Sequence, residues 1–238
     1  MFRLLKALPL ALALAASTFF TTSCSSSSQF RVVDAIPDAP VGLDVDVNGI
    51  NAFTTPFAFG TFGSVEPSSG YQKVSAGSDS IEVFQTCTTT PVIPSTSISF
   101  GGASQYTVVL AGRYASPPTA LQFTDNNTAP TSGNVEFRII HASPSTAAVD
   151  IYIIPPLTDV CSVPTKTFTN INFQAASPSY ASVAPAPYSV IATYAGTCQI
   201  ILSQDYPQGT AGMISTMVLV DQPGGGLPPQ WLPLTDVQ

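Results

Sequence analysis

The sequence has few charged residues, a single His and a single Trp. Charged side chains make up 9% of its 238 residues, with seven Lys or Arg and 14 Asp or Glu. Nucleic acid is not expected as a partner, because phosphate backbones are bound by clustered cations and these are scattered singly. One His and dispersed carboxylates give no metal-ligand spacing, so no metal or other cofactor is expected.

Helix-forming patterns are also missing after the first 23 residues, where no stretch longer than a turn repeats apolar residues every 3.6 positions. The 22 Pro and 16 Gly favour turns and disfavour helices. Hydrophobic residues reach 45%. This is the reverse of the composition of disordered chains, so a folded all-β core is expected.

The N-terminus predicts export. Residues 1–23 form a signal peptide, with basic Arg3 and Lys6 followed by the apolar run Ala7–Ala16. The run is too short for a stable membrane-spanning helix. Loss of these two basic residues changes the formal charge from -7 to about -9.

Cys24 follows Thr21-Thr22-Ser23, which resembles a bacterial lipobox but has Thr21 where an aliphatic residue is preferred. The pattern favours lipidation of Cys24, with residues 24–28 as a flexible Ser-rich tether. Cleavage without lipid is the alternative. Either way the mature protein is secreted or in the cell envelope, and with lipid it is an outer-membrane lipoprotein that contacts the membrane through its anchor.

One pattern occurs twice in the chain. Phe30–Asn48 reads FRVVDAIPDAPVGLDVDVN, and Phe137–Ile153 reads FRIIHASPSTAAVDIYI. Later segments match in the same order, at offsets that drift from 107 to 111 residues. The matched pairs are Tyr71–Val74 with Tyr180–Val183, Tyr106–Ala111 with Ser215–Val220, and Pro117–Asp125 with Pro228–Asp236. The repeat predicts one domain over 29–125, a linker over 126–134 and a second domain over 135–238.

Each copy has about seven short apolar segments separated by turn residues. This spacing predicts two tandem immunoglobulin-like antiparallel β-sandwich domains. The strands expected in the first copy are Phe30–Ala35, Leu43–Val47, Tyr71–Ser75, Ser80–Gln85, Ser97–Phe100, Tyr106–Ala111 and Leu121–Asp125.

The two openings resemble the signature of the DUF4397 family, R-V-x-H-A-S-P-D-A-P-x-V-D-V-Y-V-N-G. Arg138, His141–Pro144 and Val149–Tyr152 match it in the second copy. Arg31, Pro37–Pro40 and Asp44–Gly49 match it in the first, which has Asp34 and Asp46 in place of the family His and Tyr. The resemblance implies a bacterial envelope domain and supplies no catalytic residues.

Asp44-Val45-Asp46-Val47-Asn48-Gly49 resembles the start of a calcium-binding loop. The bidentate Glu of such a loop would fall at Thr55, and the valines suit a strand. A strand ending in a tight Asn48-Gly49 turn is therefore preferred.

No catalytic residues are predicted. His141 could serve as a base with Asp150 nearby in sequence, but there is no G-x-S-x-G elbow and the matched residue in the first copy is Asp34. A structural His at the end of the first strand is preferred.

Besides Cys24, the chain has Cys87, Cys161 and Cys198. Outside the cytoplasm a pair is expected to be oxidised. Cys87 and Cys198 are interpreted as matched positions of the two copies, so Cys161 and Cys198 are the candidate disulfide and Cys87 is the odd thiol.

The aromatic residues Phe53, Phe57, Phe59 and Phe62 either form core or line a binding groove, and core is preferred. The function expected is a non-catalytic cell-envelope protein, a surface-anchored binding or spacer module for an unknown envelope protein or polysaccharide. The alternative is a secreted carbohydrate-binding accessory or hydrolase-associated domain.

Overall fold

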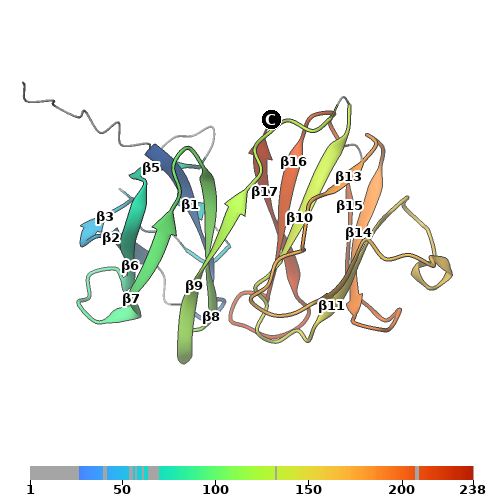
Figure 1. The fold of residues 1–238 in the computed structure, drawn as a ribbon. Helices are drawn as coiled ribbons and strands as arrows, with labels where there is room; N and C mark the ends of the chain where they lie inside the picture. Colours follow the sequence, from blue (N-terminus) through green and yellow to red (C-terminus); the bar gives the residue numbers. More distant parts are fainter. Residues whose placement is uncertain are drawn as a thin grey trace, which may run out of the picture.

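A computed structural model describes residues 27–39, 42–53, 56, 58–60, 62–63, 70–131, 133–206 and 209–237. They form two β-sandwich units, coloured blue to green and yellow to red in Figure 1. The predicted signal peptide and Cys24 lie outside the described residues, whereas Ser27 and Ser28 of the predicted tether begin the first strand. Among the described residues, no helix has the length and apolar character needed to span a bilayer.

The first unit stacks two sheets. One has the order β4-β1-β8-β9, with β5 also paired to β1, and the other has the order β3-β2-β6-β7. The strands are β1 (Ser27–Ala35), β2 (Leu43–Val47), β3 (Ile50–Asn51), β4 (Phe62–Gly63), β5 (Gln72–Ser75), β6 (Gly77–Gln85), β7 (Pro91–Phe100), β8 (Gln105–Arg113) and β9 (Ser116–Asp125).

The second unit repeats this topology, with sheets β13-β10-β16-β17 and β12-β11-β14-β15. Its strands are β10 (Val135–His141), β11 (Val149–Ile154), β12 (Phe168–Ile171), β13 (Ala181–Val183), β14 (Tyr188–Tyr194), β15 (Ile200–Tyr206), β16 (Ile214–Val220) and β17 (Gln230–Val237). The one helical element described is the 3-10 turn Val160–Ser162.

The prediction of two tandem β-sandwiches is confirmed. The order within each unit was not predicted: β1 pairs with β8, and β10 with β16, in parallel, whereas the other pairs are antiparallel. The second unit has eight strands, and where β4 pairs with β1 in the first unit, a single antiparallel bridge joins Ile140 of β10 to Ala176 in the second. Because β1 and β8 are parallel, their C-terminal ends lie at the same end of the unit.

Several prolines lie inside strands that begin earlier than the predicted bounds Ser97–Phe100 and Leu121–Asp125. Pro94 lies within β7, and Pro117 and Pro118 lie within β9. Both strands are at the ends of their sheets. A proline cannot donate to a ladder, so it is tolerated on an edge where one side needs no partner.

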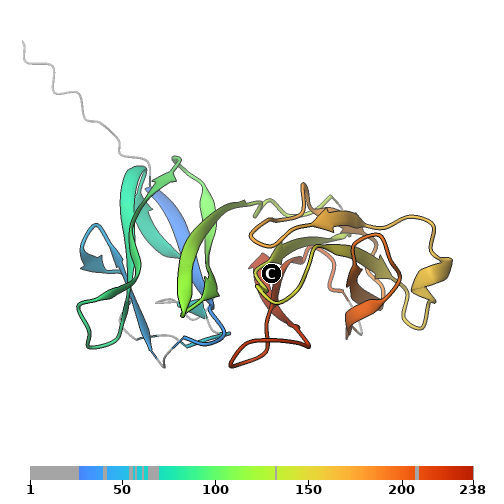
Figure 2. The same cartoon turned by 90° about the horizontal axis from the view of Figure 1, so that it is seen from below.

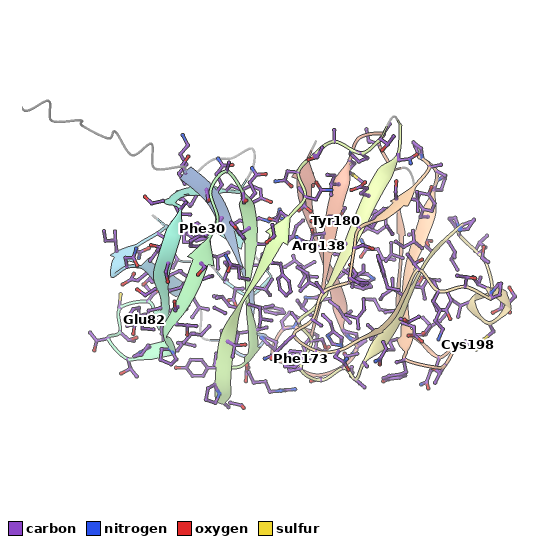
Figure 3. All side chains as sticks on the ribbon, viewed as in Figure 1. Phe30, Glu82, Arg138, Phe173, Tyr180 and Cys198 are labelled. Atoms are coloured by element: carbon purple, nitrogen blue, oxygen red, sulfur yellow. A yellow bond between two sulfur atoms is a disulfide. The ribbon has the colours of Figure 1, made fainter. Side chains whose placement is uncertain are left out.

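Alternation along β1 divides its side chains between two apolar regions. Phe30 and Val32 point into the core of the first unit (Figure 3), whereas Val33 and Ala35 point to the other face. That second face packs against the second unit, because one buried cluster contains residues of both. Its buried members are Val33, Ala35, Val109, Ala111, Ile140, Ala142, Val218, Val220 and Leu234.

The polar ends of these facing sheets share a hydrogen-bond network. Arg31 on β1 forms an ion pair with Asp236 on β17 and donates from Nη1 to the Thr235 carbonyl oxygen, 3.0 Å away. Within its own unit, Arg31 Nε donates to Thr107 Oγ1 at 2.9 Å. Thr107 donates in turn to the carboxylate of Asp125 on β9 at 2.8 Å.

The second unit makes the equivalent contacts to the first unit. Arg138 Nη2 lies 2.5 Å from Asp125 Oδ1, and Nη1 donates to the Thr124 carbonyl oxygen at 2.9 Å. Its Nε donates to Thr216 Oγ1 at 3.1 Å, and Thr216 donates to Asp236 at 2.5 Å. We call this closed network the Arg–Asp ring, with members Arg31, Thr107, Asp125, Arg138, Thr216 and Asp236.

Each arginine also lies over a tyrosine of its own unit. Arg31 Cζ is 4.9 Å from the Tyr71 ring centroid, and Arg138 Cζ is 5.1 Å from that of Tyr180, as Figure 3 shows for the second pair. Arg31 and Arg138 are 2% and 3% exposed. Burial alone would lower the pKa of the Arg31 guanidinium, but the Asp236 carboxylate raises it above its ordinary value. The interface thus has the reciprocal contacts of a two-fold dimer within one chain.

We predict that Arg138→Met lowers the free energy of unfolding by about 3–5 kcal/mol, because it leaves Asp125 buried without its charged partner. Urea denaturation measures the change. Lys73→Met is the control, because Lys73 is an exposed cation on β5 of the first unit. It should cost about 1 kcal/mol or less. Equal losses in both variants would contradict a structural role for the ring.

Candidate functional site

Four chain connections gather at one end of the molecule. The β6–β7 and β8–β9 connections of the first unit and the β14–β15 and β16–β17 connections of the second lie along the lower edge of Figure 1. Contacts between the units also reach this end: Gly224 N donates to the Pro37 carbonyl oxygen at 2.7 Å, and Arg113 hydrogen-bonds to Ser145. The loops of both units therefore lie at the same end of the molecule, and Figure 2 views the ribbon from that end.

The first unit has a groove of about 620 Å³ at this end, between the β6–β7 hairpin and the β8–β9 turn. Tyr114 lines it with a side chain that is 43% exposed, and its hydroxyl lies 3.4 Å from Gln85 Oε1. Pro91 and Pro117 line it from β7 and β9. We call this site groove 1.

The second unit has a groove of about 340 Å³ between the β14–β15 hairpin and the β16–β17 loop. Tyr194 and Gln199 line it together with Ile200 and Leu227, which are 52% and 46% exposed. Pro228 also lines this groove, as Pro117 lines groove 1. We call this site groove 2.

Strand pairing shows that the two grooves occupy equivalent places. Leu43 pairs with Gln85 as Val149 pairs with Tyr194. The β6–β7 and β14–β15 pairs have equivalent registers, and so do the β8–β9 and β16–β17 pairs. The equivalent lining residues are Gln85 and Tyr194, Thr90 and Gln199, Pro91 and Ile200, Val92 and Ile201, and Pro117 and Pro228.

The grooves concentrate exposed apolar surface. Three of the five large exposed apolar side chains among the described residues line them, namely Tyr114, Ile200 and Leu227. No acidic or basic residue occurs among the described lining residues of either groove. Each groove combines one tyrosine, one glutamine and at least one proline, a set of apolar faces and uncharged hydrogen-bonding groups.

The disulfide joins Cys161 to Cys198, the pair favoured by the sequence, with Cα atoms 5.3 Å apart. It ties the 3-10 turn to the β14–β15 hairpin that forms one wall of groove 2 (Figure 3). Cys87 is free and exposed, as expected.

The interpretation of Cys87 and Cys198 as matched positions is wrong. Pairing aligns Gln85 with Tyr194, so Cys87 corresponds to Gly196, and the two residues share a positive φ, of 64° and 78°. Cys198 lies two residues further along the equivalent hairpin. The offset between the copies is not constant, so simple spacing misplaced the pair.

Asp150 is a structural acid close to this disulfide. Its carboxylate forms an ion pair with Lys166 and accepts hydrogen bonds from Asn170 N at 2.8 Å and Gly196 N at 2.7 Å. Burial opposes its ionisation, but these donors outweigh burial and lower the pKa of the carboxyl. Asp150 does not contact His141. The pair of a His141 base with Asp150, considered because the two are near in sequence, therefore does not form.

His141 is fully buried at the end of β10. Its Nε2 lies 3.0 Å from the Ala147 carbonyl oxygen, and Ser143 N donates to Nδ1 at 3.3 Å. Burial lowers its pKa and favours the neutral ring. These contacts with turn backbone give His141 the structural place that the sequence favoured.

Asp34 takes the position of His141 in the first unit and is also buried. Its Oδ1 accepts a hydrogen bond from Ile36 N at 2.9 Å, while Oδ2 has no hydrogen-bond partner among the described residues. Burial raises the pKa of the Asp34 carboxyl from its ordinary 3.8 to about 7.

The other acids singled out by the sequence form no site. Asp44 and Asp46 share the outward face of β2, opposite Phe84 and Glu82. Asn48 and Gly49 have φ of 53° and 75°, as a tight hairpin turn requires. No group of three metal-ligating side chains occurs in the described part of the chain, and Thr55 lies outside it.

Two of the clustered aromatic residues lie in apolar packing. Phe53 is buried in the first core, and Phe59 packs against the apolar cluster between the units. Phe57 and the Phe62 side chain lie outside what the structure describes. Sequence reasoning missed Tyr114, whose place on a two-residue turn gave no periodic signal. It also missed the Arg–Asp ring, although its Arg and Asp residues recur at matched positions of the repeat.

Comparison with known proteins gives the family. Residues 28–152, just over half of the 238-residue chain, match the family described as "Domain of unknown function (DUF4397)". The chain belongs to the DUF4397 family. The match covers the first unit and ends within β11 of this DUF4397 protein. No curated protein matches the chain.

Several solved structures share a distant likeness with this DUF4397 protein. The Bacillus anthracis TIE protein has 10% identity and a TM-score of 0.27, and the match covers 83% of this chain and 34% of that one. A streptococcal virulence factor described by its alpha-glucan binding has 8% identity and a TM-score of 0.26, with 80% and 92% covered.

A third likeness is to the family CBM26 module of Eubacterium rectale Amy13K in complex with maltoheptaose. It has 8% identity and a TM-score of 0.25, with 82% of this chain and 91% of that one covered. The present chain spans about a third of the Bacillus anthracis protein. TM-scores below 0.5 carry no inference about ligand or activity.

We predict that Asp34→Asn removes a pH-dependent part of stability. Between pH 4 and 7 the folded state keeps a proton on Asp34 that the unfolded state has lost, because the pKa is raised from 3.8 to about 7. Wild-type stability therefore falls as pH rises through this range and stays lower above it, by roughly 4 kcal/mol. Asp34→Asn should be more stable than wild type at pH 8 and lose this advantage near pH 4. Urea unfolding at both values measures the difference, and an equal difference would contradict the assignment.

Proposed function

We propose that the chain is a non-catalytic binding protein of the bacterial cell envelope, exported by residues 1–23 and anchored by a lipid on Cys24. Its two sandwich units present grooves 1 and 2 to a ligand outside the cytoplasm. The observation that carries the proposal is the recurrence of a groove at the same place in both units, with most of the exposed apolar side chains gathered there.

The disulfide between Cys161 and Cys198 supports the location, since such bonds persist in oxidising compartments. The uncharged linings support binding rather than acid–base catalysis. The buried surfaces of the Arg–Asp ring support a fixed presentation of both grooves, because moving the units apart would leave four charged groups unpaired.

We expect the full chain, expressed in a Gram-negative bacterium, to fractionate with membranes and to carry acyl groups on Cys24. Intact mass spectrometry measures the addition. Cys24→Ser should move the protein to the soluble periplasmic fraction, whereas the matched control Cys87→Ser should stay with the membrane. A bare N-terminus on membrane-purified wild type would contradict the anchor.

We expect the soluble chain carrying Cys24→Ser to sediment with cell envelopes that have been stripped of protein by protease. Tyr114→Ala combined with Tyr194→Ala should abolish sedimentation, because it removes the ring from each groove. Ile50→Ala is the control, as Ile50 is 73% exposed on β3 and lies outside both grooves. Sedimentation that is unchanged in the double variant would place binding elsewhere.

A further inference from the structure

We propose that grooves 1 and 2 bind two segments of one neutral polysaccharide chain, so that the protein binds it bivalently. The inference rests on the proposed function and deepens it by naming the ligand class.

The charge pattern of the surface favours a neutral ligand. The sequence has a formal net charge of -7, which disfavours a polyanion. A polycation would be bound by acids, and these lie elsewhere: Asp46 is opposite Glu82 (labelled in Figure 3) across β2 and β6, and Asp44 is on β2 two residues away. The described lining of both grooves lacks acidic and basic residues.

The side-chain types that occur in both grooves suit a sugar ligand. A tyrosine ring and proline offer apolar faces to the C–H surface of a pyranose, and the amide and hydroxyl groups match its hydroxyls. Groove 1 takes its tyrosine from the β8–β9 turn and its glutamine from β6, as Tyr114 and Gln85. Groove 2 takes its tyrosine from β14 and its glutamine from the β14–β15 hairpin, as Tyr194 and Gln199. The two units thus keep the same pair of side chains although the individual positions differ.

The arrangement of the grooves favours a repeating polymer over a peptide. Both grooves open at the end of the molecule where Gly224 contacts Pro37 and Arg113 contacts Ser145. A polysaccharide presents the same segment many times and can occupy both equivalent sites. Proline-rich peptides dock in grooves lined by aromatic rings, whereas each groove here has one ring among its described residues. With both sites engaged, the second binding event is intramolecular and the apparent affinity rises.

Affinity electrophoresis of the chain carrying Cys24→Ser tests the proposal. Native gels contain glycogen or yeast mannan as neutral polymers, or polygalacturonate as a charged one. Decaproline is the peptide probe, titrated by NMR. We expect a neutral polymer to retard the protein. Tyr114→Ala and Tyr194→Ala should each weaken retardation about tenfold or more, because each removes the bivalent contribution. The double variant should migrate freely, and Ile50→Ala should behave as wild type.

A short oligosaccharide of the retarding polymer should perturb the NMR signals of both grooves in wild type. In each single variant it should perturb only the intact groove, with unchanged affinity there. Ile200→Ala replaces Tyr194→Ala if the latter lowers the melting temperature. The proposal is overturned if no neutral polymer retards the protein, if only polygalacturonate or decaproline binds, or if one single variant abolishes both sites. Binding to stripped envelopes without retardation by neutral polymers would overturn this inference and leave the proposed function standing.

Discussion

The Arg–Asp ring is the constraint on which the arrangement of this protein depends. It places two arginines and two aspartates out of water, and each ion pair joins residues of different units. Buried ion pairs contribute little net stability, but separating them is costly. The main effect of the ring is therefore to fix the relative position of the two units. It adds little to the stability of either unit. That position brings the loop ends of both units to one surface.

The two duplicated units differ outside the Arg–Asp ring. The ends of β1 and β10 carry Asp34 and His141 in the same buried place, and the two side chains have different hydrogen-bond partners. Only the second unit has a disulfide, which fixes the hairpin beside groove 2, while the equivalent hairpin in the first unit has the free Cys87. Both grooves keep a tyrosine and a glutamine, but the tyrosine comes from the β8–β9 turn in groove 1 and from β14 in groove 2. The interface has thus stayed symmetrical, and the loop ends have not.

Much of the fold follows from the sequence because alternation reports which strand face is apolar. Leu43–Val47 was predicted with its observed bounds, and the Asn48-Gly49 turn forms as expected. Alternation does not say what covers a face, so the packing of Val33 against the second unit was not predicted. The strand predicted over Ser97–Phe100 begins at Pro91 and includes Pro94, which is tolerated because β7 is an edge strand. Grooves between separate hairpins leave no local pattern at all.

Differential scanning calorimetry of the whole chain tests the central claim most directly, namely that the ring joins two sandwiches into one cooperative body. The account predicts a single transition near neutral pH, with the calorimetric enthalpy equal to the van't Hoff enthalpy. Unfolding one unit would leave the arginine and aspartate of the other without partners, so the units should unfold together. Two separate transitions, with a calorimetric enthalpy about twice the van't Hoff value, would contradict it.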